Sequence, residues 1–294
     1  MKSVKVILLN YNNPYPTIKL VESLLKQEQV DLSIIVVDNC SPDNSYVILS
    51  NELNQYEKVQ VLKSLNNGGY ASGNNFGLHN LDNINDKDYV AILNNDLIIE
   101  DKLLFSKLID EHYNTQNIGF IAPAQKDSLG DIYSHSAWRK PSFFQDLMMS
   151  FWIYRKFIVA NTYNLNTDTK KIPVEILPGS FLLTTYKHFK DIEFFDEGTF
   201  LFLEERILYD KTVRKNKQNY LLKDVFYLHE GSSTIDQELS NVSKYKILYD
   251  SLLYYTKKYR SYGYMKSLIL WPFLKYSLLE LQIINKLKKL KAKF

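Results

Sequence analysis

Residues 89–100 read YVAILNNDLIIE, and they decide the fold that we predict for the first half of the chain. The apolar part, Tyr89–Leu93, has the length and composition of a buried β-strand, and it stops at the polar residues Asn94, Asn95 and Asp96. A carboxylate at such a place is either an ordinary turn residue or a ligand for a divalent cation. One carboxylate and the phosphates of a bound diphosphate can hold Mg²⁺ or Mn²⁺, which makes Asp96 a candidate metal ligand.

The residues before this stretch repeat the same strand pattern. Strand-like runs lie at Val4–Leu9, Leu32–Val37 and Val59–Leu62, and helical spacing of apolar residues lies between them at Thr17–Lys26 and Asn44–Gln55. Strands and helices that alternate in this way predict an α/β fold whose parallel sheet is covered on both faces. Such sheets bind ligands outside the carboxyl ends of their strands, so the residues at those ends are the candidates for function.

Polar residues follow the first two strands directly. Asn10 and Tyr11 come after the first strand, and Asp38 comes after the second. The carboxylate of Asp38 can accept a hydrogen bond from the N–H of a nucleobase. It can also cap the next helix, a role that Ser41 or Asp43 can fill instead. The sequence leaves both explanations open.

A glycine-rich stretch, Asn66–Asn75 (NNGGYASGNN), follows the third strand. The adjacent Gly68 and Gly69 allow positive φ angles and a close approach of the backbone to a ligand. Ser72 and Gly73 lead into a predicted helix, and the free N–H groups at a helix start favour anions. The spacing matches neither the dinucleotide fingerprint nor the phosphate-binding P-loop, and an ordinary turn is the alternative.

The second half of the chain is less regular and carries further candidates. We expect strands at Ile118–Ala122, Ile172–Thr185 and Tyr220–Leu228, a helix at Phe200–Lys217, and helical structure from Ser240 onward. Near the start of the Phe200 helix, Glu204 and Glu205 either complement the helix dipole or supply a general base. His229, at the end of a strand, is a candidate metal ligand, although a histidine without that role is the commoner case. Gly179 either lets a substrate approach closely or makes a turn.

The bulk composition is that of a folded protein without intrachain disulfides. Hydrophobic residues make up 45% of the 294-residue chain, which is enough for a large core, and the net charge is only +3. The single cysteine, Cys40, excludes an intrachain disulfide and favours a reducing compartment. At the N-terminus, the apolar run before Asn10 is too short for a signal peptide, so we interpret it as a buried strand.

Six runs of sequence, in their order and spacing, resemble glycosyltransferase family 2, whose members are inverting enzymes of the GT-A fold that build bacterial surface polysaccharides. The runs are VILLNYNN at 6–13, VVDNCSPDNS at 36–45, NNGGYASGNNFGL at 66–78, ILNNDLIIE at 92–100, LPGSFLLT at 177–184 and FLEERILYDKTVRK at 202–215. The rhamnosyltransferase-like and capsular-polysaccharide members are the most similar. The resemblance implies an α/β GT-A domain with a mixed, mostly parallel sheet at residues 1–240, and a C-terminal helical extension at 241–294.

The resemblance also implies ligands and roles. The donor would be a nucleotide-sugar, linked to UDP or dTDP, and the cofactor would be Mn²⁺ or Mg²⁺. The acceptor would be a saccharide, linked to lipid through polyprenyl diphosphate. Residues expected around the nucleotide are Asn10 and Tyr11 beside the base, Asp38 bound to it, and Asn67, Gly68, Gly69, Asn94, Asn95 and Gly179 along the pocket. Asp96 would hold the metal, at the last position of an Asp-x-Asp-type motif, and His229 would complete the metal shell.

The chain departs from the family pattern at the catalytic acid. Family members usually carry Glu-Asp where this chain has Glu204 and Glu205, and the second acid is the base, so Glu205 is the candidate. Glutamate in place of aspartate moves the carboxylate by one methylene. A further aspartate, often found two residues later, is replaced by Ile207. The implied mechanism is an in-line displacement that inverts the anomeric carbon without a covalent intermediate.

The C-terminal residues 251–294 contain ten lysines or arginines and one acid, a balance of +9. Apolar and polar residues fall on different helix faces: Leu274, Leu278, Leu281, Ile284 and Leu287 on one, and Lys275, Gln282, Lys286, Lys289 and Lys293 on the other. Trp271, Phe273 and the tyrosines at 254, 255, 259, 262 and 264 suit a membrane interface. We therefore expect a cytoplasmic enzyme that binds the inner face of the membrane peripherally. Packing on its own core or a homodimer is the alternative.

A membrane-spanning helix is not expected from this region, because only eight uncharged residues, 267–274, separate Lys266 from Lys275. The basic, aromatic segment Trp138–Arg155 is a candidate second membrane contact or a loop over the acceptor site.

Three other functions fit parts of the sequence. A nucleic-acid-binding protein would explain the basic, tyrosine-rich end but not the polar strand ends, so we expect no nucleic-acid partner. A nucleotidyltransferase normally needs a basic phosphate-binding loop, and residues 10–17 contain no Lys or Arg. A scaffold that keeps the fold without catalysis is compatible with the departures at Glu205 and Ile207.

Overall fold

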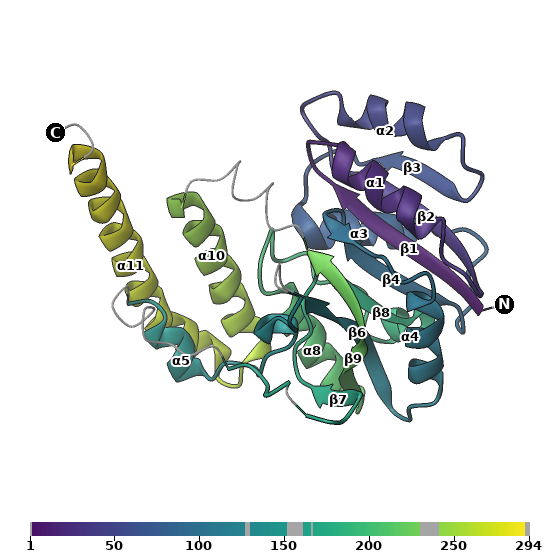
Figure 1. Cartoon of the computed structure of the whole chain (residues 1–294). Coiled ribbons are helices and arrows are strands. Elements are labelled where there is room, and N and C mark those ends of the chain that lie inside the picture. The colour runs from purple at the N-terminus through teal and green to yellow at the C-terminus, as the bar shows by residue number, and fades with distance from the viewer. Residues whose placement is uncertain (1, 127–129, 152–160, 166, 230–240, 292–294) are drawn as a thin grey trace.

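The computed structural model describes residues 2–126, 130–151, 161–165, 167–229 and 241–291. Its first part alternates strands and helices as the sequence predicts (Figure 1). The strands are β1 (Lys2–Asn10), β2 (Val30–Asp38), β3 (Val59–Lys63) and β4 (Tyr89–Asn94), and the helices are α1 (Tyr15–Leu24), α2 (Ser45–Leu53) and α3 (Gly69–His79). The order along the chain is therefore that of a parallel α/β unit.

One sheet runs through the molecule in the order β3-β2-β1-β4-β8-β6-β9-β5. The strands from the second half of the chain are β5 (Leu97–Ile98), β6 (Ile118–Lys126), β8 (Phe181–Thr185) and β9 (Gln218–His229), and a further strand, β7 (Lys171–Val174), pairs with β9. The four strands β1 to β4 pair only in parallel with one another, and β1 lies between β2 and β4. Asn10 therefore lies opposite Asp38, and Leu9 lies opposite Asn94. Because the chain crosses from β3 to the other side of β1 to form β4, the edge beyond β1 and β4 is a topological switch point, where ligands bind.

The second half of the chain adds the antiparallel strands that make the sheet mixed. Its elements are β5 (Leu97–Ile98), α4 (Leu104–Tyr113), β6 (Ile118–Lys126), the short 3₁₀ helix η1 (Ser134–Ser136), α5 (Phe143–Met148), β7 (Lys171–Val174), β8 (Phe181–Thr185), α7 (Tyr186–Asp191), α8 (Glu204–Arg214) and β9 (Gln218–His229). Strand β8 pairs antiparallel with β4 and β6, and β9 pairs parallel with β6 and antiparallel with β5.

Two apolar clusters cover the two faces of the sheet. On β1, Val6 and Leu8 enter one cluster and Ile7 enters the other, because neighbouring side chains of a strand point to opposite faces. Helices α1, α2 and α4 contribute to the first cluster, and α3, α7 and α8 to the second. Burial of each such side chain contributes roughly 1.5–3 kcal/mol, so the sheet fixes the strand ends firmly.

Two helices begin three or more residues away from their predicted starts. We expected a helix start at Ser72 and Gly73, but α3 begins at Gly69, whose N–H donates to the Asn67 side chain at 3.1 Å. The helix expected from Phe200 begins only at Glu204. Phe202 and Leu203 have left-handed φ angles of 73° and 74°, which a continuous helix does not allow.

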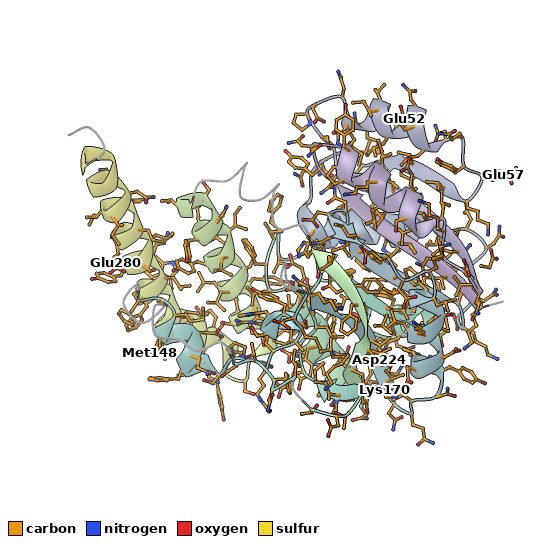
Figure 2. The ribbon with its side chains drawn as sticks, viewed as in Figure 1. Glu52, Glu57, Met148, Lys170, Asp224 and Glu280 are labelled. Carbon is orange, nitrogen blue, oxygen red and sulfur yellow. The ribbon has the colours of Figure 1, made fainter. Side chains whose placement is uncertain are left out.

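The C-terminal helices α10 (Asn241–Tyr259) and α11 (Gly263–Lys291) lie side by side as a hairpin beside α8 and α5 (Figure 1). A third apolar cluster joins them to α8: it contains Leu203, Ile207, Tyr249, Leu252, Tyr255, Tyr259, Leu270 and Leu274. Met148 of α5 lies on this side of the molecule, and Glu52 of α2 lies far from it (Figure 2).

Helix α11 differs from the amphipathic helix that we predicted. Leu274 and Leu281, expected on a membrane-facing side, are buried within the protein. Exposed apolar residues lie elsewhere on the helix: Met265, Leu268, Ile269, Trp271, Tyr276, Leu279 and Ile283. The helix is therefore apolar on more than one face. The predicted positions Leu287, Lys289 and Lys293 lie outside the described side chains.

The length of α11 bears on the expectation that no helix of this region spans a membrane. The helix continues through Lys266 and Lys275, and residues 263–286 contain an 18-residue window of mean hydropathy 1.3, of which 22% is buried in the protein. By length and composition, this part of the helix could cross a bilayer. It is the one helix among the described residues that qualifies, and it does so by length and composition alone.

Three of the tyrosines that we assigned to a membrane interface have other partners. Tyr254 and Tyr259 donate hydrogen bonds to Asp196, and Tyr255 donates to Asp210. The prediction that these three tyrosines lie at a membrane interface was wrong. Local sequence did not reveal it, because the aspartates that bind them belong to distant parts of the chain. Tyr262 and Tyr264 are exposed.

Candidate functional site

The ends of β1 and β2 form a compact polar cluster. The Asn10 amide donates to Asp38 Oδ1 at 3.2 Å, and the Ser41 hydroxyl donates to the same oxygen at 2.6 Å. The Ser41 N–H donates to Asp38 Oδ2 at 3.1 Å. Asp38 therefore holds the turn after β2. It does not cap α2, whose first N–H, that of Ser45, donates to Asp43 Oδ1 at 2.9 Å. Asp38 is fully buried, and the three bonds leave about one acceptor position of its carboxylate.

Asn10 is fully buried, and its side chain hydrogen-bonds to three neighbours. Its amide N–H binds Asp38, as described above, and its side-chain oxygen Oδ1 accepts from the Thr17 hydroxyl at 2.7 Å and from the Asn95 amide at 3.3 Å. Asn95 also donates to the Thr17 hydroxyl at 2.9 Å. Three chain segments are tied together here, so Asn10 and Asn95 position the strand ends around Asp38. Tyr11, the next residue, is half-buried.

The glycine-rich loop lies beside this cluster. Asn39 donates to Asn67 Oδ1 at 2.9 Å and to the Gly69 carbonyl at 3.2 Å, which fixes the loop against the end of β2. Gly69 has a φ of +86°, and a Cβ atom there would lie 1.9 Å from the backbone oxygen of Phe200. A Cβ on Gly68 would lie 2.5 Å from the Ser72 hydroxyl. Both glycines are thus required by the close packing of the loop.

Asp96 and His229 are brought together by strand pairing. Leu97 lies opposite His229 in the β5–β9 pair, so Asp96 is next to the histidine, and His229 Nε2 is 2.9 Å from Asp96 Oδ1. Both side chains are partly exposed, at 15% for Asp96 and 19% for His229. No group of three or more His, Cys, Asp or Glu side chains suited to a metal occurs within the described ranges.

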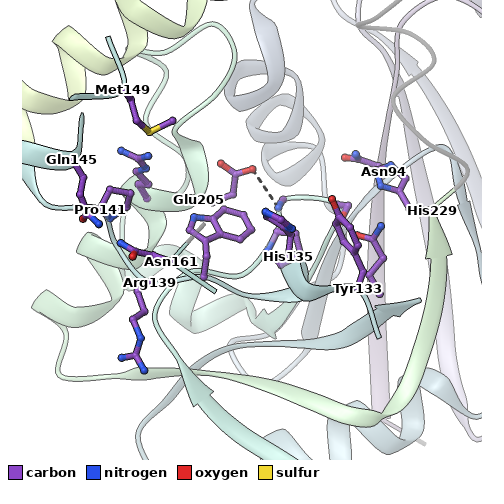
Figure 3. A pocket seen from close by; sticks show the side chains of 16 residues that line it. Asn94, Tyr133, His135, Arg139, Pro141, Gln145, Met149, Asn161, Glu205 and His229 are labelled. Atoms are coloured by element: carbon purple, nitrogen blue, oxygen red, sulfur yellow. Dashed lines mark hydrogen bonds between the residues drawn. The ribbon is translucent and has the colours of Figure 1, made fainter. Parts of the chain in front are cut away.

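A cavity of about 580 Å³ joins these strand ends to helix α8. Its lining residues are Asn94, Gln125, Tyr133, His135, Trp138, Arg139, Pro141, Gln145, Met149, Asn161, Pro178, Gly179, Ser180, Glu205, Arg206 and His229. Asn94 and His229 lie on one side of it, with Tyr133 and His135 between them and Glu205, and Gln145 and Met149 on the far side (Figure 3). The structure therefore gathers Asn94, Gly179, Glu205 and His229 at one site.

Glu205 is held at the wall of this cavity. Its Oε1 accepts the N–H of Gly179 at 3.4 Å, and the Gly179 carbonyl accepts the hydroxyl of Tyr70 at 2.6 Å (Figure 3 shows the Glu205 contact). A Cβ on Gly179 would lie 3.0 Å from that carboxylate oxygen, so a larger residue there would push the carboxylate by a few tenths of an ångström. Burial raises the pKa of Glu205, which suits a base at neutral pH.

Glu204 is the second acid at the start of α8, and its side chain is buried. Burial raises the pKa of its carboxyl strongly, and the charge of the neighbouring Glu205 raises it further. The Thr199 hydroxyl is placed to donate to it, at 3.4 Å. Two acids with raised pKa values at the start of α8 are a candidate functional site, besides complementing the helix dipole.

Ile207 now has a structural explanation. It is 1% exposed and lies in the apolar cluster between α8 and the C-terminal hairpin. A carboxylate there would lose its water without gaining a partner. The departure from the family pattern therefore belongs to the packing of α10 and α11 on α8.

Several cavity residues escaped the sequence analysis. Arg206 follows Glu205 directly and donates to Asp146 of α5 at 2.8 Å, and Asp146 also pairs with Arg260 at the end of α10. Trp138 lines the cavity. Basic and aromatic character around Trp138 was visible in the sequence, but the pairing of Asp146 was not, because its partners are far along the chain.

The sequence of this chain is similar to those of known glycosyltransferases. The model of the family described as Glycosyl transferase family 2 matches residues 5–185. Glycosyltransferase GlyG of Streptococcus pneumoniae is 31% identical over 101 residues, which are 34% of this chain and 32% of that protein. The low-salt glycan biosynthesis hexosyltransferase Agl10 of Haloferax volcanii is 25% identical over 209 residues, 70% of this chain and 60% of that protein. The matches thus span less than two thirds of either relative.

A solved structure matches almost the whole chain. The mannosyltransferase PcManGT from Pyrobaculum calidifontis, in complex with GDP-Man and Mn²⁺, superposes with a TM-score of 0.58 at 12% identity, over 94% of this chain and 74% of that one. This likeness confirms the predicted GT-A fold. The family model covers more than half of the 294 residues, and the chain therefore belongs to glycosyltransferase family 2.

Proposed function

We propose that this protein transfers a sugar from a nucleoside-diphosphate donor to a hydroxyl group of a saccharide acceptor, with inversion of the anomeric carbon. The observation that carries the proposal is the single cavity that Asn94, Glu205 and His229 line together. It gives a carboxylate with a raised pKa and the polar ends of β4 and β9 access to the same space. General-base catalysis on a bound sugar needs this arrangement.

The donor nucleotide is assigned to the strand ends and the glycine-rich loop. Asp38 would accept an N–H of the base beside Tyr11, and Asn10 and Asn95 would hold Asp38 and the loop after β4 in place. Asn67, Gly68 and Gly69 would border the nucleotide beside the start of α3. UDP and dTDP are the proposed nucleotides, by family resemblance.

The residues Asp96 and His229 fit a divalent cation. A carboxylate oxygen and an imidazole nitrogen 2.9 Å apart are both partly exposed, and together they leave most positions of a six-coordinate ion to diphosphate oxygens and water. Mn²⁺ accepts both ligand types, and Mg²⁺ prefers the oxygen. When bound, the ion neutralises charge on the leaving diphosphate.

Glu205 performs the proton transfer in this proposal. Its carboxylate takes the proton of the acceptor hydroxyl while the acceptor oxygen forms a bond to the anomeric carbon. On the opposite side, the bond from that carbon to the diphosphate oxygen breaks, and the nucleoside diphosphate leaves with the electron pair. The N–H of Gly179 keeps the carboxylate oriented, and burial keeps its pKa high enough for a base.

A lipid-linked acceptor fits the surroundings of the cavity. Met149, at its rim, directly follows α5, and α5 contacts α11. Phe144 of α5 and Leu268 and Trp271 of α11 are exposed apolar residues of these two helices. We propose that this surface binds the anionic inner face of the cytoplasmic membrane, so that a polyprenyl-diphosphate-linked saccharide enters the cavity from the bilayer.

A binding screen followed by a transfer assay tests the function. Thermal shifts with UDP, dTDP and GDP, each with and without Mn²⁺, should show a metal-dependent stabilisation by at least one nucleotide. Incubation with the matching nucleotide-sugars and a saccharide acceptor should then give a product whose anomeric configuration, determined by NMR, is inverted. A protein that no nucleotide stabilises and that hydrolyses or transfers no sugar contradicts the proposal.

A further inference from the structure

We propose that Tyr254 and Tyr259 of α10 are positioning residues for the Glu204–Glu205 pair. They would act through Asp196 and the segment 196–203, which leads into α8. The inference rests on the proposed function and assigns a catalytic task to the C-terminal hairpin.

The segment that leads into α8 is held in an unfavourable backbone conformation. Phe202 and Leu203 have φ angles of 73° and 74°, although neither is glycine, and no side chain caps the helix that starts after them. Bulky residues keep the left-handed conformation only where surrounding contacts enforce it. The directions of the Glu204 and Glu205 side chains follow from this turn, so whatever enforces it positions both carboxylates.

Helix α10 supplies the contacts that enforce it. The Tyr254 hydroxyl donates to Asp196 Oδ1 at 2.7 Å, and the Tyr259 hydroxyl donates to Oδ2 of the same carboxylate. Lys258 Nζ lies 2.9 Å from that Oδ2. Further along the segment, the Ser251 hydroxyl donates to the carbonyl of Leu201 at 2.8 Å. Four residues of one helix thus bind the segment at Asp196 and at Leu201, which directly precedes the left-handed turn.

The charge of Asp196 and the space at Gly198 show how closely the two parts fit. Burial alone would raise the pKa of Asp196, but hydrogen bonds from Tyr259, Lys258 and Tyr254 overcome it and lower the pKa to about 2. A Cβ on Gly198 would lie 1.9 Å from Cζ of the Tyr254 ring. A backbone without a side chain is therefore needed where α10 approaches the segment.

The other side of the segment 196–203 contacts the glycine-rich loop. The N–H of Tyr70, next to Gly69, donates to the carbonyl of Phe200 at 2.9 Å. The segment 196–203 therefore lies between the start of α3 and α10. Among charged groups, Glu205 raises the pKa of Glu204, and Arg206 of α8 lowers the pKa of Glu205. Burial and both acids in turn raise the pKa of the Tyr70 hydroxyl of α3.

Loss of the tyrosine hydroxyls has a specific expected consequence. The turn relaxes, and water reaches Glu204 and Glu205. Burial is the main cause of their raised pKa values, so both pKa values fall toward 4.5. The acidic limb of the pH profile, which reports ionisation of the base, moves to lower pH. The misplaced carboxylate also lowers kcat, by about 10-fold to 100-fold.

The test compares a Tyr254→Phe, Tyr259→Phe double variant with wild type, using the full chain. The matched control is Tyr113→Phe on α4, which is 75% exposed and remote from the site. Readouts are nucleotide Kd by calorimetry, kcat and KM for transfer, the pH profile of kcat/KM, and Tm. We expect a nucleotide Kd within about twofold of wild type, together with the lower kcat and the shifted acidic limb.

A second variant keeps the test informative if the double variant folds poorly. Gly198→Ala removes no hydroxyl, but its Cβ would lie 2.2 Å from the Tyr254 hydroxyl oxygen and so pushes the segment away from Tyr254. It should lower kcat and shift the acidic limb in the same direction. Wild-type kcat and pH profile in the double variant overturn the inference. So does a parallel loss of nucleotide affinity and activity without a shift of the limb, which indicates a general loss of structure. Failure of wild type to bind any nucleotide overturns the proposed function, and the inference with it.

Discussion

His229 Nε2 lies 2.9 Å from Oδ1 of Asp96, although 133 residues separate the two in the sequence. The short strand β5 begins directly after Asp96, and its pairing with the end of β9 sets Leu97 opposite His229. The register of one two-residue strand therefore assembles the proposed metal site. Sequence spacing alone does not reveal this pairing.

Replacement of Asp96 by Asn should abolish the metal-dependent part of nucleotide binding. The amide has no charge and is a weak ligand for a hard cation, while the shape of the strand end is kept. Calorimetry with UDP or dTDP, with and without Mn²⁺, measures the effect. His229→Gln should weaken Mn²⁺ affinity less, by roughly 10-fold to 100-fold. If Asp96→Asn keeps the full metal-dependent gain, the metal assignment is wrong.

Replacement of Glu205 by Gln should lower kcat by about 10²-fold to 10⁴-fold without loss of nucleotide binding, because it removes the base and little else. Glu204→Gln is the matched control, since it neutralises the adjacent acid at the same helix start. It should lower kcat far less. Initial rates at saturating donor measure both effects. Equal losses in the two variants would contradict the assignment of Glu205 as the base.

The buried carboxyl of Glu204 should make stability fall as pH rises. Burial and the charge of Glu205 raise its pKa in the folded state above the ordinary value of 4.5, so the folded state holds the proton more tightly than the unfolded state. This contribution is complete below pH 4.5 and is lost as pH rises through the raised pKa.

Glu204→Gln removes the titration, and its stability relative to wild type should therefore increase from pH 5 to pH 8. A difference of one between the pKa values of the folded and unfolded states corresponds to about 1.4 kcal/mol of unfolding free energy. Urea unfolding at both pH values measures the difference. A constant difference between the two proteins would show that Glu204 titrates normally.

Replacement of Gly69 by Ala should destabilise the glycine-rich loop and weaken nucleotide binding. The φ of +86° disfavours alanine, and its Cβ would lie 1.9 Å from the Phe200 backbone oxygen. Gly130→Ala provides the control, because Gly130 has a φ of +87° but nothing within 4 Å of the added Cβ. The Gly69 variant should lose about 1–3 kcal/mol more than the Gly130 variant in urea unfolding. Equal losses would mean that only the backbone angle matters.

Replacement of Leu268 and Trp271 by Ser should release the protein from vesicles that contain anionic lipid. Both side chains are exposed on α11, at 59% and 54%, and their insertion would add to the attraction of the basic C-terminus. Co-sedimentation at low and high salt measures binding. Leu65→Ser, at a residue that is 97% exposed in the first half of the chain, is the control. Unchanged sedimentation, or a dimer that these substitutions dissociate, would count against membrane docking.

Local sequence patterns are sufficient to predict the first half of the fold. Strand-like runs that end at Asn10, Asp38 and Asn94 form β1, β2 and β4 within one or two residues of the predicted bounds. The prediction succeeds because alternation of buried strands and amphipathic helices is a local property of the chain. The strand ends also make Asp96 a candidate from the sequence alone, since the carboxyl ends of parallel strands share one edge.

Contacts between distant segments decide how the candidate residues are used. Asn10, which we expected beside the base, uses its side-chain amide to hydrogen-bond with Asp38, Thr17 and Asn95. The tyrosines at 254 and 259, which we expected at a membrane, bind Asp196 instead. Helix α11 buries the apolar face that we had assigned to lipid and exposes another. In each case the partner comes from a distant segment, and local periodicity carries no information about which segments the fold brings together.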